Sequence, residues 1–229
     1  MMVRASWGPR LESYEACGEK LQLILPAVDC AVGDFRPWLD AKRRSAEIAG
    51  NVGQHMYQNL SDVDKSPLEY MGWSVSLHRG TPPSRSVFRV QSGAEAWTGN
   101  NVFLEFPDQF RFDWRSIRSL ILEIQTIYEP DAIIVSSTEG LGRRVKTGQP
   151  SPVFDWMVYL ANTIIPAEEL PMVHSVERVG SGTLVILKKE PINLENPDDI
   201  ALVEAVEPVI RRHQPDLELK PPPRRPRTI

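Results

Sequence analysis

Trp73-Ser74-Val75-Ser76-Leu77-His78 and Asn100-Asn101-Val102-Phe103-Leu104-Glu105-Phe106 are the two stretches that decide the fold class. In the first, apolar side chains alternate with polar ones, and in the second Val102, Leu104 and Phe106 fall on one face, which is typical of a β-strand with one face buried. A further strand is expected between them, at residues 87–91. Because only short loops separate these segments, we expect them to pair as an antiparallel meander.

Helical patterns lie on both sides of this run of strands. Apolar residues recur at helical spacing over residues 11–25, and Pro26 is expected to end or kink that helix because it has no N–H to donate. A second helix of low apolar content is expected through Ala46 and Ile48. The clearest pattern covers residues 117–128, where isoleucine, leucine and tyrosine trace one stripe of an amphipathic helix.

The C-terminal third is expected to add strands and one more helix. Residues 132–136 are a short apolar segment, typical of a strand that is buried on both faces. Two apolar segments, 173–179 and 183–188, flank a Gly-Ser-Gly turn, which predicts a hairpin since glycine adopts positive φ easily. Asn196-Pro197 starts a helix that Pro208 is expected to limit or bend.

The order of these elements favours an α+β fold. Strands come in a run instead of alternating strictly with helices, so we expect an antiparallel central sheet with helices packed mainly on one face. The helix at 117–128 could also cross over into the strand at 132–136, and a mixed sheet therefore stays open as an alternative.

Length and composition predict one folded domain with a tail. The chain has 229 residues, of which 41% are hydrophobic, and this is ordinary globular composition. We expect a single domain over residues 1–219. Residues 220–229 begin Lys-Pro-Pro-Pro-Arg-Arg-Pro-Arg and are expected to form a disordered, extended tail. The net charge is −4, and because the tail carries four basic residues, the body before it carries −8.

The acidic body limits the classes of partner. It would repel phosphate backbones, which argues against a nucleic-acid ligand, and it would suit a basic partner. Mild acidity can also serve solubility alone. The chain shows no apolar run of signal-peptide length at its start and no stretch of about 20 apolar residues, so we expect no membrane span and a cytoplasmic location.

The sequence predicts no catalytic residue, cofactor or metal. The four histidines are scattered without metal-ligand spacing: His55, His78, His174 and His213. Residues 140–145 begin like a dinucleotide fingerprint, but Val145 stands where the third glycine belongs. An enzyme would instead need a cleft with converging ionisable side chains.

Several segments carry a resemblance to a known family. Taken together, in their order and spacing, they resemble the immunity protein 52 family of bacterial polymorphic-toxin systems, over about Val3 to Arg212. Family members tend to carry Trp-Asn-Gly after the central strand, where this chain has His78-Arg79-Gly80, and a glycine where it has Asp155. The segments are Trp7-Gly8-Pro9-Arg10 with Glu12, Met71 to Leu77, Asn100 to Pro107, Tyr128-Glu129-Pro130-Asp131 with Ser136-Ser137, and Trp156 to Leu160.

The resemblance implies an antidote that binds and neutralises a cognate toxin. Such toxins are delivered by contact-dependent routes such as type VI secretion and often carry a restriction-endonuclease-like nuclease domain. A nuclease presents a basic groove, which an acidic body could fill by direct occlusion. The alternative is an adaptor or chaperone that binds the effector for secretion without inhibiting it. The oligomeric state is not predicted.

Five residues are the expected contacts with this partner. Trp97 lies in a glycine-flanked loop between strands, and tryptophan is enriched at interface hot spots. The alternative for Trp97 is a loop that folds back over the sheet edge. Asn100, Glu105, His78 and Asp155 are expected to be exposed beside it, near one end of the sheet.

Overall fold

The computed structural model describes residues 1–43, 45–46, 57–58, 71–94, 100–107, 110, 112–137, 156–193 and 195–213. The segment at 139–152 and the tail at 220–229, for which the sequence predicts a loop and disorder, lie outside these residues. The elements follow in the order β1 (Met2–Trp7), α1 (Tyr14–Val32), β2 (Trp38–Leu39), β3 (Ser45–Ala46), β4 (Tyr57–Gln58), β5 (Met71–Arg79), β6 (Ser86–Ala94), β7 (Asn100–Glu105), α2 (Trp114–Tyr128), β8 (Ala132–Ser136), β9 (Met157–Leu160), the 3-10 helix η2 (Ala167–Glu169), β10 (Ser175–Val179), β11 (Gly182–Ile186) and α4 (Pro197–His213).

One large antiparallel sheet organises the chain. Its strand order is β10-β11-β9-β8-β1-β7-β6-β5-β2-β3, and β4 also pairs with β5. The predicted meander is confirmed as β5-β6-β7, and the predicted hairpin is confirmed as β10-β11. The mixed alternative is wrong for the described strands, because β8 runs antiparallel to both of its neighbours, β1 and β9.

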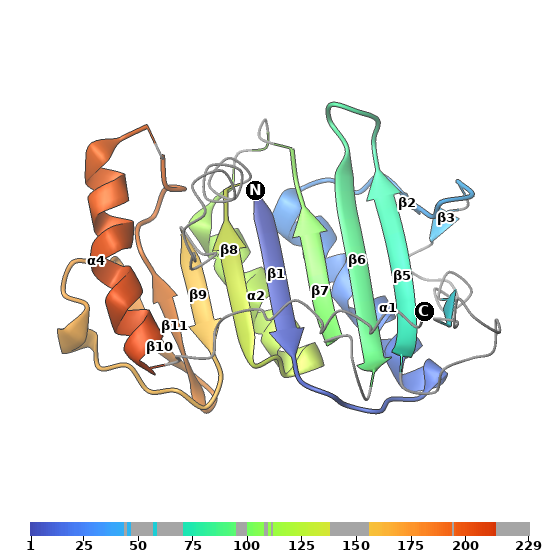
Figure 1. Cartoon of the computed structure of the whole chain (residues 1–229). Coiled ribbons are helices and arrows are strands. Elements are labelled where there is room, and N and C mark those ends of the chain that lie inside the picture. The colour runs from blue at the N-terminus through green and yellow to red at the C-terminus, as the bar shows by residue number, and fades with distance from the viewer. Residues whose placement is uncertain are drawn as a thin grey trace, which may run out of the picture.

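The helices lie on both faces of the sheet (Figure 1). Helices α1 and α2 pack behind it, where their apolar side chains form one core with the inward residues of β1, β7 and β6. Helix α4 lies at the β10–β11 end of the sheet (Figure 1) and shares a second, smaller core with residues of β8, β9 and β11. The predicted covering of mainly one face therefore describes α1 and α2 but not α4.

Two prolines do not end their helices, and one segment expected to be helical forms a strand. Pro26 lies inside α1, which continues to Val32 because its later residues, such as Val28, are buried against the sheet. Pro208 likewise lies inside α4, which runs to His213. Ala46 belongs to the short strand β3 and not to a helix, since its backbone pairs with Trp38 of β2. Packing has outweighed local propensity at each position.

The ends of the helices are set by local signals. The Ser13 side chain caps α1 by accepting from the amide of Ala16, and Asp113 caps α2 by accepting from Arg115. Gly33 ends α1 in the left-handed conformation that glycine adopts easily. Among the described helices, none is both long enough and apolar enough to cross a membrane.

Candidate functional site

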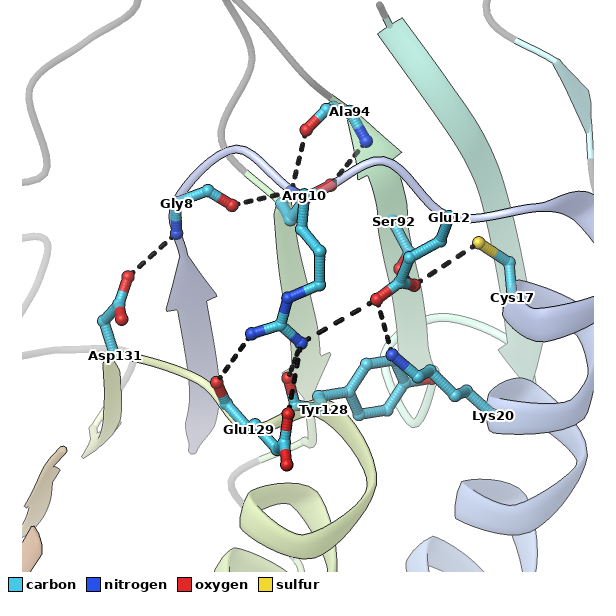
Figure 2. A network of polar contacts seen from close by, with 11 residues as sticks. Gly8, Arg10, Glu12, Cys17, Lys20, Ser92, Ala94, Tyr128, Glu129 and Asp131 are labelled. Atoms are coloured by element: carbon cyan, nitrogen blue, oxygen red, sulfur yellow. Dashed lines mark hydrogen bonds and ion pairs between the residues drawn. The ribbon is translucent and has the colours of Figure 1, made fainter. Parts of the chain in front are cut away.

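The turn after β1 is tied to the end of α2 (Figure 2). The amide of Gly8 donates to Asp131 Oδ2 at 2.8 Å, and the guanidinium of Arg10 donates to the carbonyls of Tyr128 at 2.9 Å and Glu129 at 3.2 Å. A cation on these carbonyls satisfies the unpaired acceptors at a helix C-terminus and complements its dipole. Two segments of the family resemblance thus meet in space, although about 120 residues separate them.

Glu12 extends this connection to α1 and β6. Its carboxylate accepts from Lys20 Nζ at 2.5 Å and from the Ser92 hydroxyl at 2.6 Å. Burial alone would raise the pKa of Glu12, but the hydrogen bonds from Lys20 and Ser92 outweigh it and lower that pKa. Burial raises the pKa of the neighbouring Cys17 thiol to about 11, so this thiol stays protonated at neutral pH. The arrangement serves to fix the turn and not to activate a nucleophile.

Asn100 completes the same connection and is buried, so its predicted exposure is wrong. Its Oδ1 accepts from the amide of Ala94 at 2.8 Å, and its Nδ2 donates to the carbonyls of Ala94 at 3.0 Å and Gly8 at 2.9 Å. The side chain faces the core because Asn100 shares the alternation phase of the buried Val102. Asn100 therefore joins β6, β7 and the turn after β1 instead of facing a partner.

Arg79, at the other edge of this half of the sheet, is held in a buried charged cluster. Its side chain and that of Asp29 are each only 1% exposed, and the two form an ion pair. Arg79 also donates to the backbone carbonyl of Asp34, and its guanidinium lies 4.2 Å from the ring centroid of Trp38. The Trp38 indole N–H donates to Asp29 at 3.0 Å. The cluster connects β2 and α1 to β5.

The front of β1, β7, β6 and β5 is the open half of the sheet. In Figure 1 none of the described helices lies in front of these strands. Backbone register arranges their front residues in three rows, which we call the open face. The rows are Ser6-Asn101-Gln91-Ser74, Arg4-Phe103-Arg89-Ser76 and Met2-Glu105-Val87-His78.

The middle row of the open face holds an aromatic ring between two arginines. Phe103 pairs across the backbone with Arg4 on one side and with Arg89 on the other. The Arg89 guanidinium carbon lies 5.8 Å from the centroid of the Phe103 ring, within the range of a cation–π contact. Arg4 is half-buried and Arg89 is exposed. This row offers an apolar surface with a cation at each side.

The corner of the open face at His78 lies in a mainly positive environment. Burial lowers the pKa of His78 first, and Arg85 and Arg43 lower it further, against an opposing effect of Asp40. Glu105 lies in the same row as His78, two strands away, and is the one carboxylate among the twelve residues of the open face. The open face is thus locally basic, although the chain as a whole is acidic.

A separate cavity of about 670 Å³ lies where β8 ends, at Ser136, and where β9 begins, beside Trp156. Four of its thirteen described lining residues are aromatic, Phe110, Phe112, Trp114 and Trp156, and the charged residues Lys189 and Glu190 are part of it as well. The lining also holds Asp113 and Arg115, whose ion pair measures 3.7 Å and is largely exposed. Its described residues include neither histidine nor cysteine. The lining is therefore mixed in character and does not point to one class of ligand.

The structure brings together two of the five predicted contact residues. His78 and Glu105 share one row of the open face, Asn100 is buried behind it, and Trp97 and Asp155 lie outside the described residues. Sequence reasoning missed Arg4, Phe103 and Arg89. The available signal was alternation, because Phe103 has the same phase as Glu105, which was expected on the solvent side.

Three comparisons with known proteins extend these observations. The sequence profile of the family described as immunity protein 52 matches residues 115–214. A solved structure, the Pseudomonas aeruginosa T6SS protein PA0821, aligns over 93% of this chain and 75% of its own length, with a TM-score of 0.51 and 9% sequence identity. At that identity the likeness shows a shared fold. No curated protein matches the chain by sequence. The predicted resemblance is thus confirmed: from α2 to the end of α4, the chain matches the immunity protein 52 family.

Proposed function

We propose that this chain is an immunity protein that binds and neutralises a cognate toxin of a type VI secretion system. The match of residues 115–214 to the immunity protein 52 family carries this proposal. The fold shared with a type VI secretion protein supports the same setting. The chain acts by binding and not by catalysis, in the cytoplasm, where a nucleic-acid-degrading toxin would do its damage.

The geometry that supports binding is a broad surface and not an acid–base cleft. Four strands present the open face, and it carries an aromatic ring and two arginines, which are residue types enriched at protein interfaces. The toxin is a nuclease, which must present a basic region to its nucleic acid, and the chain's net charge of −4 favours its approach. Direct occlusion of that basic region falls to the acidic part of the body outside the open face, since the open face itself is locally basic.

Co-expression with the toxin encoded beside this chain tests the proposal. Cells that produce the toxin should survive only when this chain is present, and purified toxin should lose its nuclease activity in a stoichiometric complex. A chain that binds the toxin but leaves its activity intact would be an adaptor or chaperone. A toxin that kills equally with and without this chain would refute the immunity role.

A further inference from the structure

We propose that the open face docks an acidic patch of the toxin, with Arg4 and Arg89 as its charged contacts and Phe103 as the apolar contact between them. This inference rests on the proposed function and adds to it the face used and the chemistry of the patch it meets. The argument has three parts: unpaired cations, local charge and the size of the face.

The two arginines have no carboxylate partner among the described residues. Each of the other buried or half-buried arginines named above is paired, Arg79 with Asp29 and Arg10 with the carbonyls at the end of α2. Arg4 is half-buried beside the α4-covered part of the sheet, since its backbone also pairs with Ile134. A cation that has lost part of its hydration without gaining an anion is stabilised when a partner supplies one.

The pKa of Arg4 responds to the same environment. Burial lowers it, and no anion among the described residues opposes that effect. A carboxylate from a partner would therefore stabilise a charge that the isolated chain leaves uncompensated.

Local charge identifies an acidic patch as the complement. The open face carries Arg4 and Arg89 against the single carboxylate of Glu105. Near its corner at His78, Arg85 and Arg43 add positive charge against the one carboxylate of Asp40. The basic C-terminal tail of this chain, residues 220–229, has the wrong sign to be the complement. The acidic residues that set the net charge lie elsewhere, so that overall steering and the final contact depend on different parts of the molecule.

The size of the open face makes it the centre of an interface. Four strands about 4.8 Å apart and five residues at about 3.4 Å give an area of roughly 300 Å². A stable complex buries about 800 Å² on each partner. Arg and aromatic residues concentrate at the centre of such interfaces, where their truncation costs most. We therefore expect the middle row to dominate the affinity, with the other contacts distributed around it.

Charge reversal tests the docking face. Titration calorimetry would compare an inactive toxin variant binding to wild-type chain, to Arg4→Glu/Arg89→Glu and to a control, Arg115→Glu/Arg178→Glu. The control reverses two exposed arginines outside the open face and produces the same change in net charge. We expect the face variant to lose at least about 100-fold in affinity and the control less than about 3-fold, because pairing and not overall charge is removed.

Milder variants separate a loss of binding from a loss of the folded state. Arg89→Glu alone, at an exposed position, and Arg4→Gln/Arg89→Gln should each weaken binding about 10-fold while the thermal unfolding temperature stays near that of the wild type. Equal losses in the face variant and the control, or full affinity in all of the face variants, would overturn the docking face while leaving the immunity role intact. Failure of the wild-type chain to bind would overturn both.

Discussion

The two halves of the sheet are built differently, and the difference separates scaffold from surface. In β8, β9 and β11 every residue is buried, because their side chains belong in part to the core that contains α2 and in part to the core that contains α4. In β7, and in β1 from Val3 onward, buried residues alternate with half-buried ones, because helices cover only one face there. Met2 and Val87, in the outermost row of the open face, are themselves buried. The half that is covered once keeps a face that no described helix covers. Polar and charged contacts, and not a second core, hold the turn after β1 and the edge of this half at β5.

The largest stability effect should come from the buried ion pair at the outer edge of the open half. Arg79→Met keeps the volume of the side chain but leaves the Asp29 carboxylate, 1% exposed, without its cation. We expect a loss of about 3–5 kcal/mol in the free energy of unfolding, measured by urea denaturation. Arg36→Met removes an ion pair whose arginine is 58% exposed and should cost less than about 1 kcal/mol. Equal effects would mean that the edge does not depend on the buried pair.

A pair of truncations compares the two halves directly. Leu160→Ala removes a fully buried side chain between β9 and α4 and should cost about 2–5 kcal/mol. Phe103→Ala removes a half-buried ring from the open face and should cost less than about 1 kcal/mol in stability. Chemical denaturation measures both. If Phe103 costs as much as Leu160, then Phe103 belongs to the core and not to a binding face.

Asn100 and Asn101 sharpen the comparison within one strand. Asn100→Ala leaves the buried amide of Ala94 without its acceptor and should cost about 1–3 kcal/mol. Asn101→Ala changes the neighbouring residue, which is half-buried on the open face, and should cost less stability than Asn100→Ala. The affinity of the folded chain for the toxin should stay near that of the wild type in Asn100→Ala, whatever the loss of stability. If Asn100→Ala kept its stability but bound the toxin more weakly, Asn100 would contact the toxin, as the sequence predicts.

The smallest effect concerns the pH dependence of the turn after β1. The pKa of Glu12 is lower in the folded chain than its ordinary value of 4.5, so the unfolded chain takes up the proton first as the pH falls. Stability from Glu12 is therefore complete above pH 4.5 and is lost as the pH falls through the lowered pKa. In thermal melts Glu12→Gln should show a weaker decline below pH 4.5 than the wild type. Glu19→Gln, an exposed position of α1, is the control, and identical curves for both variants would contradict the role of Glu12.

Local patterns in the sequence predict much of this fold, and long-range pairing explains what they miss. Alternation and helical stripes locate the meander, α2 and the C-terminal hairpin. They do not place β1 between β7 and β8, because the partner residues lie about 100 positions away along the chain. The continuous apolar run of β8 does predict burial on both faces, which α4 provides.

The site is predicted less well than the fold. Alternation correctly puts Glu105 and His78 on a common face, and the same rule would have placed Asn100 in the core and Phe103 on the open face. Composition does not predict the basic character of this face, because the net charge of the chain sums over its whole surface. Only the register of three strands, β1, β7 and β6, brings Arg4 and Arg89 to either side of one ring.

Hydroxyl-radical footprinting of the chain, alone and in complex with inactive toxin, tests the open face most directly. Phe103 and the Arg4 and Arg89 peptides that flank it should react less in the complex. Leu23 and Met172, which are 63% and 48% exposed on other surfaces, should react equally in both states. Protection of Leu23 or Met172 with unchanged reactivity of Phe103 would place the partner elsewhere and contradict the division into scaffold and surface.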